Sequence, residues 1–596
     1  MTQPTPQPAN LLDTFDHVVV LMLENRSFDN LLGYLYSQKY PVPPGSQFEG
    51  VDGKNLTNPI PAAYQFNGHN GAPVTTVPVA RNNAVSNPAN YSQPYPDPGE
   101  DYPHVNTQLF NPANPQPVNQ TPYNLPSPVP APSMIGFVTD YIQNYIHNEF
   151  PTKPLPPLDK FYDKYKVIME CFDPSDVPVL SSLAREFAVF DHWFCAVPSE
   201  TICNRNFWHA GTSWGHVINP GPEDDKGDEP NGPNTDRWLL DTAGFTLFNQ
   251  LSIAARSWKI YSDNKIPLPG KNNFPFPALP LLHFLAFTPL LIFDRPDIFN
   301  TLESFKSDCA SGNLPAYSFI EPNFFDPHND MHPSTPGETV DGPQKVGSVL
   351  LGEALVWEIY HAIFTSPALW DNTLLVITFD EHGGCYDHVP PPGQYGQNAV
   401  QPAAIAAPPD LTGYVPWDGF AFQRLGLRVP TVMVSPYIKA NTIINQPMSH
   451  SSFLKTVHEK WALPSLSTRE NASPYFHDTG LLSPTLQRAN ISAMPNLPAP
   501  VIPVDNTDYS KAIMSALAKA IMAVFKELWC KAFPEDCPPQ KIETNEEAAA
   551  FFRDKVNKSK LKLGPTVALR AQAAATNDHD WMLPLQAIAE ELKKKQ

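Results

Sequence analysis

The stretch LLVITFDEHGGCYDH, Leu374 to His388, decides the fold expected for this chain. Its first six residues, Leu374 to Phe379, are apolar and rich in β-branched side chains, which is typical of a strand buried on both faces. The strand ends at Asp380 and Glu381, and a Gly-Gly pair then frees the backbone to turn. Carboxylates at the C-terminal end of a buried strand lie where open α/β sheets bind ligands, and they suit a divalent cation. Taken alone, the stretch also fits a strand followed by a solvated acidic turn.

Other segments repeat an alternation of helix and strand. Val346 to Phe364 has apolar residues at helical spacing and leads into the strand above, and Ser452 to Trp461 predicts a further helix. Further strands are predicted at His17 to Leu23, Tyr317 to Ile320 and Pro430 to Ser435. This order predicts an α/β fold with a mostly parallel central sheet.

Composition narrows the class of protein. The 596 residues suffice for one large α/β domain with additions or for several ordinary domains. With 70 prolines against 29 glycines, the long connections are expected to be stiff and irregular, not flexible. Forty basic and 60 acidic residues give a net charge of −20, which argues against non-specific nucleic-acid binding and against attraction to anionic membranes. Zwitterionic lipids remain open as substrates.

Cysteines and the N-terminus bear on the compartment. The seven cysteines form no regular pattern and no CxxC pair, so neither a disulfide framework nor a zinc motif is expected. The opening residues lack a basic region followed by an apolar run, which predicts synthesis in the cytoplasm without a cleavable signal peptide. Export by a non-classical route is the alternative. The apolar run from Pro280 to Phe293 contains two prolines and is too short to span a bilayer.

Changes of character along the chain predict three regions. Residues 1–12 are a flexible, Pro-rich tail, and residues 13–499 form the main domain, with long Pro-rich insertions that include an ordered excursion over 40–135. Residues 500–596 form a helical appendage, in which Tyr509 to Lys531 is amphipathic. We expect this appendage to mediate self-association as a homo-oligomer. Transient docking on a membrane surface is the runner-up.

Four separated segments end in residues with metal- or phosphate-binding chemistry: Glu24-Asn25, Thr201 in PSETICNR, His332 in HNDMHP, and Asp380-Glu381. The ENRSFD run at Glu24 to Asp29 and the TFDEHGGCYDHVPPP run at Thr378 to Pro392 resemble two signatures of one bacterial phosphoesterase family. That family contains phosphatidylcholine-preferring phospholipases C and related acid phosphatases. The resemblance covers roughly residues 12–495.

The resemblance implies an alkaline-phosphatase-like three-layer α/β sandwich with one divalent metal ion. By position, the implied metal ligands are Glu24, Asn25, Thr201, Asp380 and Glu381. An all-oxygen set favours calcium, magnesium or manganese, with zinc as an alternative. Cys203 stands where the family has proline, and this leaves Ser199 as a rival nucleophile to Thr201. Threonine at this place is typical of the phospholipase branch, and serine of the acid phosphatase branch.

The implied chemistry is hydrolysis of phosphatidylcholine-type lipids to diacylglycerol and phosphocholine through a phosphothreonyl intermediate. His332 and His104 are candidates for protonating the leaving oxygen and contacting the phosphate, and Asn25 and Asn204 for binding the phosphate. A broad-specificity acid phosphatase and a non-catalytic assembly module are the alternatives. Structural readings also exist: Asn25 as a helix cap, Thr201 as a turn hydroxyl, and both histidines as packed, hydrogen-bonded side chains.

Overall fold

The computed structural model describes residues 10–112, 129–219, 246–268, 272–275, 298–325, 327–334, 348–393, 395 and 420–502, and scattered positions between 522 and 554. Most of the predicted tail at 1–12, the apolar run at 280–293 and most of the predicted appendage at 500–596 lie outside these residues. The expectations for those segments, including the amphipathic helix at 509–531, therefore stay predictions.

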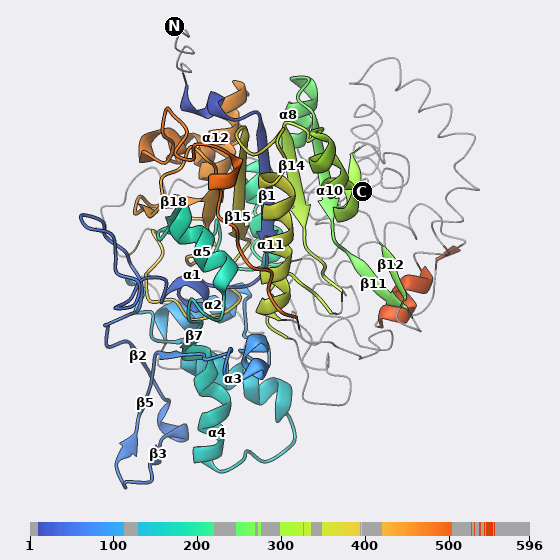
Figure 1. Ribbon diagram of the computed structural model, residues 1–596. Helices are drawn as coiled ribbons and strands as arrows, with labels where there is room; N and C mark the ends of the chain where they lie inside the picture. Colours follow the sequence, from blue (N-terminus) through green and yellow to red (C-terminus); the bar gives the residue numbers. More distant parts are fainter. Residues whose placement is uncertain are drawn as a thin grey trace, which may run out of the picture.

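An eight-stranded mixed sheet organises the described part of the chain (Figure 1). Its strands, in spatial order, are β13 (Phe299–Thr301), β10 (Trp258–Ser262), β14 (Tyr317–Glu321), β1 (His17–Leu23), β15 (Thr373–Phe379), β16 (Val432–Val434), β8 (Ala188–Phe190) and β17 (Thr442–Ile444). Only β16 runs antiparallel to its two neighbours in this sheet. The predicted α/β class with a mostly parallel central sheet is confirmed.

Strands β1 and β15 form the middle of the sheet. All seven residues of β15 and the six residues from Val18 to Leu23 are buried, as their apolar and β-branched composition predicts. The two strands pair in parallel from His17 opposite Thr373 to Leu23 opposite Phe379. Because the pairing continues to the last residue of both strands, the segments that follow them leave the sheet side by side.

Two groups of helices flank the sheet and complete three layers (Figure 1). Helix α11 (Val349–Phe364) contacts α5 (Pro178–Glu186) and α10 (Leu302–Ser311). Helix α6 (Thr201–Ala210) contacts α8 (Leu247–Ile253) and α12 (His450–Trp461). The described part of the predicted helix ending at Phe364 is confirmed as α11. Helix α12 begins two residues before the predicted Ser452, because Ser449 and Ser452 form a capping box at its start.

Much of the Pro-rich excursion folds into a smaller lobe beside the sheet (Figure 1). Its elements are β2 (Thr57–Pro59), β3 (Phe66–Asn67), β4 (Pro73–Val74), β5 (Thr76–Pro78), β6 (Ala80–Arg81), α2 (Tyr102–Phe110), α3 (Phe137–Glu149), α4 (Leu158–Tyr165) and β7 (Glu170–Cys171). The lobe has its own apolar cluster, in which Tyr141, Phe161 and Tyr165 are buried. Helix α2 packs on α3 and carries polar side chains back toward the sheet.

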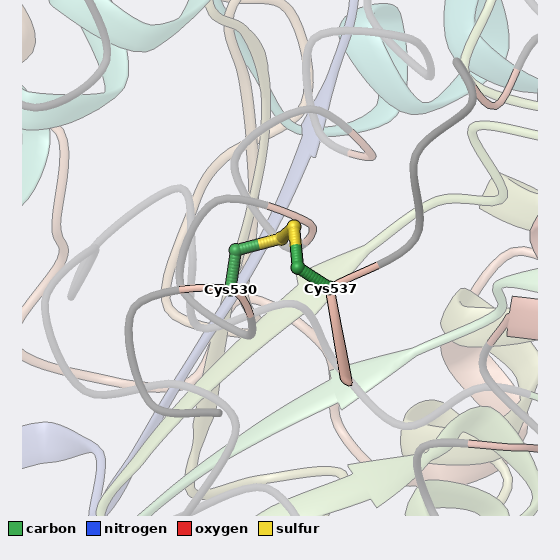
Figure 2. Close-up of a disulfide and its surroundings, with 2 residues drawn as sticks. All are labelled: Cys530 and Cys537. Atoms are coloured by element: carbon green, nitrogen blue, oxygen red, sulfur yellow. A yellow bond between two sulfur atoms is a disulfide. The ribbon is translucent and has the colours of Figure 1, made fainter. Parts of the chain in front are cut away.

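Short elements complete the described chain: α1 (Phe28–Leu32), β9 (Trp193–Phe194), β11 (Lys265–Leu268), β12 (Asn272–Pro275), β18 (Met448–Ser449) and α13 (Thr468–Ala472). Cys530 and Cys537 form a disulfide (Figure 2), while the other five cysteines are buried and form no disulfide. No framework was expected from the cysteine count, and a single local bridge between residues seven apart leaves no signature in that count. Within the described residues, none of the helices combines the length and apolarity that crossing a bilayer requires.

Candidate active site at the carboxyl edge of the sheet

The segments after β1 and β15 meet at one edge of the sheet. The backbone N–H of Asn25 donates to Asp380 Oδ1 over 3.2 Å, and the N–H of Glu381 donates to the same oxygen over 2.7 Å. Asn25 has a φ of 54° and Gly383 a φ of 61°, so both turns pass through the left-handed region. A Cβ on Gly383 would lie 2.2 Å from the Asn25 carbonyl oxygen, so only glycine allows the two turns to pack.

Arg205 joins the two acidic turns. Its Nη2 donates to Glu24 Oε1 over 2.5 Å, and its Nε donates to Asp380 Oδ2 over 3.3 Å. All three side chains are fully buried. A buried charge needs a partner, and here one guanidinium lies against two carboxylates and holds the ends of β1 and β15 to helix α6.

Thr201 is the first residue of α6 and is 1 % exposed. The Asn204 side chain secures the turn before it: Nδ2 donates to the Ser199 carbonyl over 2.7 Å, and Oδ1 accepts from the Val197 N–H over 3.0 Å. Thr201 and Arg205 are four residues apart, so they share a face of the helix. Thr201 therefore lies on the same side of α6 as Arg205, the residue that contacts Glu24 and Asp380, and at the positive end of the helix dipole.

Ser199, the rival hydroxyl, is also fully buried, and its Oγ has no hydrogen-bond partner. It precedes the helix, and its carbonyl accepts from Asn204. The structure brings both hydroxyls to the same turn and leaves Thr201 as the residue in register with Arg205.

Three buried oxygen atoms of the predicted ligand set have no hydrogen-bond partner: Glu24 Oε2, Asn25 Oδ1 and Glu381 Oε1. Burial, followed by the negative charge of Asp380, raises the pKa of Glu24 well above its usual range, although Arg205 opposes the shift. The same two causes raise the pKa of Glu381. Unpartnered hard donors and mutually repelling carboxylates are the features expected of a cation site, so the residues present fit a divalent metal ion.

A hydrogen-bonded chain links His382, the residue after Glu381, to His104. Gln108 Oε1 accepts from His382 Nε2 over 2.8 Å, Gln108 Nε2 donates to Asp140 Oδ2 over 2.8 Å, and His104 Nδ1 lies 2.7 Å from Asp140 Oδ1. His382 Nδ1 in turn lies 3.1 Å from Glu381 Oε2. Burial alone lowers the pKa of His104, but the charges of Asp140 and Asp101 raise it to about 9. His104 is therefore an oriented imidazolium at neutral pH.

His332 follows β14 and is 5 % exposed. Its backbone N–H donates to Asp330 Oδ1 over 2.9 Å, and its Nδ1 donates to the Pro333 carbonyl over 2.5 Å. Burial lowers its pKa to about 4, although Asp330 opposes the shift. Its Nε2 lies 3.9 Å from Asp97 and 3.9 Å from Glu100, and Glu100 accepts a hydrogen bond from Asn25 Nδ2. His332 thus belongs to the same edge as the ends of β1 and β15.

His450 supports the site from α12. Its Nε2 donates to the Asp380 carbonyl over 2.6 Å, and its Nδ1 accepts from Trp193 Nε1 over 3.2 Å. His450 therefore fixes the backbone of the acidic turn, which is a structural role.

Sequence reasoning named the residues at the strand ends but missed several of their partners. Arg205 stands in the quoted PSETICNR run, where the pattern of a basic residue four positions after the hydroxyl could have placed it on the same helix face. Asp97, Glu100, Gln108 and Asp140 come from the lobe. The Pro-rich sequence around the first three carries little periodicity, and the helical spacing around Asp140 does not reveal its partners.

The sequence of this chain is similar to those of known proteins. The profile of the Phosphoesterase family matches residues 15–464. The chain is 31 % identical to "Non-specific phospholipase C6" of Arabidopsis thaliana over 77 % of this chain and 71 % of that protein. It is 27 % identical to "Phospholipase C B" of Mycobacterium tuberculosis over 91 % of this chain and 90 % of that protein.

Among solved structures, a protein in the alkaline phosphatase superfamily from Vibrio parahaemolyticus matches with a TM-score of 0.27 and 10 % identity, over 51 % of this chain and 64 % of that one. The assignment of the fold rests on the sheet and its flanking helices.

Proposed function

The chain belongs to the Phosphoesterase family and is a hydrolase, and from this premise we propose that it is a phospholipase C acting on phosphatidylcholine-type lipids. The products are diacylglycerol and phosphocholine. One observation carries the proposal: Glu24, Asn25 and Glu381 each present a buried, unpartnered oxygen at the sheet edge that Arg205 ties to the helix of Thr201.

Thr201 is the nucleophile in this proposal. Its place at the N-terminus of α6 favours the negative charge that develops on its oxygen and on the phosphoryl group. Asn204 keeps the preceding turn rigid, so the hydroxyl needs little reorganisation before attack. We therefore give Asn204 the role of positioning Thr201. Direct contact of Asn204 with the phosphate stays a prediction.

Glu24, Asn25, Asp380 and Glu381, with the Thr201 oxygen, would hold the metal ion. When bound, a divalent cation favours ionisation of a coordinated hydroxyl and offsets charge on phosphoryl oxygens. Asp380 accepts two backbone N–H groups and an arginine, so its carboxylate is fixed in direction.

His104 is the proposed acid for the leaving diacylglycerol oxygen. Its Nδ1 is engaged by Asp140, which leaves the Nε2 proton for donation, and its pKa of about 9 keeps that proton in place at neutral pH. His332 is neutral at that pH, and its proton lies on Nδ1, bound to the Pro333 carbonyl. Of the two candidate histidines, His104 is therefore the one that can donate a proton to the leaving oxygen at neutral pH.

Charge favours a phosphodiester over a phosphomonoester as substrate. The edge is surrounded by five acidic residues: Glu24, Asp97, Glu100, Asp380 and Glu381. The whole chain has a net charge of −20. The negative net charge of the chain repels a monoester dianion more strongly than a zwitterionic lipid with one negative phosphate. The proposal also includes transient contact with a membrane surface. Synthesis in the cytoplasm, export without a cleaved signal and self-association through 500–596 stay predictions.

The test compares p-nitrophenyl phosphorylcholine with p-nitrophenyl phosphate. The phospholipase proposal expects clear preference for the phosphorylcholine ester. Preference for the monoester would instead support a broad-specificity acid phosphatase. Equal, residual rates for the native chain and Thr201→Ala would support a non-catalytic module.

A further inference from the structure

A second group of potential ligands lies next to the predicted metal site. Asp97 and Glu100 precede helix α2, and His332 follows β14, so three side chains from two distant segments converge. Their ligand atoms all lie within 4.8 Å of one another, with His332 Nε2 3.9 Å from each of the two carboxylates. We call these three residues the Asp97 cluster.

The tautomer of His332 leaves one ring nitrogen able to bind a cation. Its Nδ1 donates to the Pro333 carbonyl, so the neutral ring presents a lone pair at Nε2. That atom faces two carboxylate oxygens at a spacing too long for a hydrogen bond. His332 is 5 % exposed, so an electron-pair donor is held, nearly buried, against two others.

The spacing also suits a metal ion. Metal–ligand bonds of about 2.0–2.4 Å set neighbouring ligand atoms about 3–4 Å apart. Carboxylate and imidazole together are the mixed donor set that manganese and zinc accept.

A second cluster of the same composition shows the contrast. Asp29, Asp387 and His388 also converge, but Arg428 donates to Asp29 over 2.8 Å and to Asp387 over 3.0 Å. A guanidinium therefore already supplies the positive charge there. Near the Asp97 cluster, Arg26 donates to the backbone carbonyls of Met331 and Gln93 and to Asn30 Oδ1, and it acts on Asp97 through its charge.

We propose that Asp97, Glu100 and His332 bind a second divalent cation beside the first. Asn25 links the two proposed sites, because its Nδ2 donates to Glu100 while its Oδ1 has no hydrogen-bond partner and belongs to the ligand set of the first site. This second site extends the proposed phospholipase function. It rests on that function only for the assignment of the first metal site.

Metal counting tests the proposal on the full chain. Chelator-stripped protein is titrated with Mn²⁺, and bound ions are counted by electron paramagnetic resonance. The native chain is expected to bind two ions, whose spectrum is broadened by spin–spin coupling. Asp97→Asn/Glu100→Gln and, separately, His332→Gln are expected to bind one, without the broadening. Asp101→Asn, a neighbouring carboxylate that caps α2, is the matched control and should bind two.

Several results would overturn the proposal. These are a single Mn²⁺ in the native chain, or two ions retained by both variants of the cluster. Choline, used as a second probe, would also overturn it if it bound the native chain in competition with Mn²⁺ and was lost in the same variants. A chain that binds two ions but releases no phosphocholine would sink the proposed function and leave the second site standing. Circular dichroism of each variant checks the fold.

Discussion

Arg205 donates to Glu24 over 2.5 Å although 181 positions separate the two residues along the chain. The pair joins helix α6, which begins at Thr201, to the end of strand β1. The same guanidinium reaches Asp380 after β15. Helix α6 and the two acidic turns are thus held as one unit by a fully buried ion pair.

Arg205→Ala should destabilise the metal-free protein strongly, because it leaves Glu24 and Asp380 buried without a counter-charge. Breaking such a buried pair typically costs about 3–5 kcal/mol. Urea unfolding measures the change, and added Mn²⁺ should recover part of it by supplying positive charge. Arg488→Ala is the control, since its pair with Glu186 is partly exposed to solvent and contributes about 1 kcal/mol or less. Equal losses for the two variants would contradict the role given to Arg205.

The strand ends could be predicted from the sequence because their signal is local. His17 to Leu23 and Leu374 to Phe379 are apolar runs that stop at acidic residues, and the structure confirms both strands and their neighbouring ends. The helices before and after them follow from apolar spacing. Parallel pairing of two buried strands then dictates that Asn25 and Asp380 meet.

The remaining partners could not be predicted because they depend on how the lobe folds back. Asp97 and Glu100 lie in a Pro-rich segment whose sequence carries no helical or strand period. Asp140 lies in a segment with helical spacing, but that spacing does not show which residues it meets. Their positions follow from the packing of α2 on α3, which is set by long-range contacts. The role of Arg205 has a different explanation. The PSETICNR motif points to a hydroxyl nucleophile, and nothing in the motif shows that the arginine four residues later contacts the two acidic turns.

Removing the hydroxyl of Thr201 should abolish turnover. Thr201→Ala is expected to lower kcat on p-nitrophenyl phosphorylcholine by at least about a thousandfold, since loss of a nucleophile removes the covalent route. Thr201→Ser should keep part of the activity, because the oxygen remains. Ser199→Ala is the matched control and should retain most of the rate. The reverse order of the two alanine variants would transfer the nucleophile to Ser199.

His104 should give the pH profile its alkaline limb. A pKa of about 9 means that the imidazolium is present below that pH, so kcat/KM should fall as pH rises through about 9. Asp140→Asn removes the charge that raises the pKa, and the limb should move to lower pH. Asp159→Asn, a carboxylate at the start of α4, serves as the control. An alkaline limb that stays in place in Asp140→Asn would exclude His104 as the acid.

Glu353 should make stability depend on pH. This α11 carboxylate accepts the N–H groups of Val179 and Leu180 at the start of α5, and burial raises its pKa to about 7. Because the folded pKa exceeds the usual 4.5, the stabilisation is complete below pH 4.5 and is lost as pH rises through about 7. The unfolding free energy of the native chain minus that of Glu353→Gln should fall by about 3 kcal/mol across this window.

The matched control for Glu353 is Glu303→Gln, which changes an exposed carboxylate on α10. Its difference from the native chain should stay within about 0.5 kcal/mol throughout, as is usual for surface substitutions. A difference for Glu353→Gln that is equally flat would show that the buried carboxylate titrates in its ordinary range.

Hydrolysis of phosphatidylcholine in isotopically labelled water tests the central claim most directly. Attack at phosphorus through Thr201 predicts that the Mn²⁺-loaded chain releases diacylglycerol and phosphocholine, with the label in phosphocholine alone, and that Thr201→Ala releases neither. Label in the diacylglycerol hydroxyl, or release of phosphatidate and choline, would contradict the account.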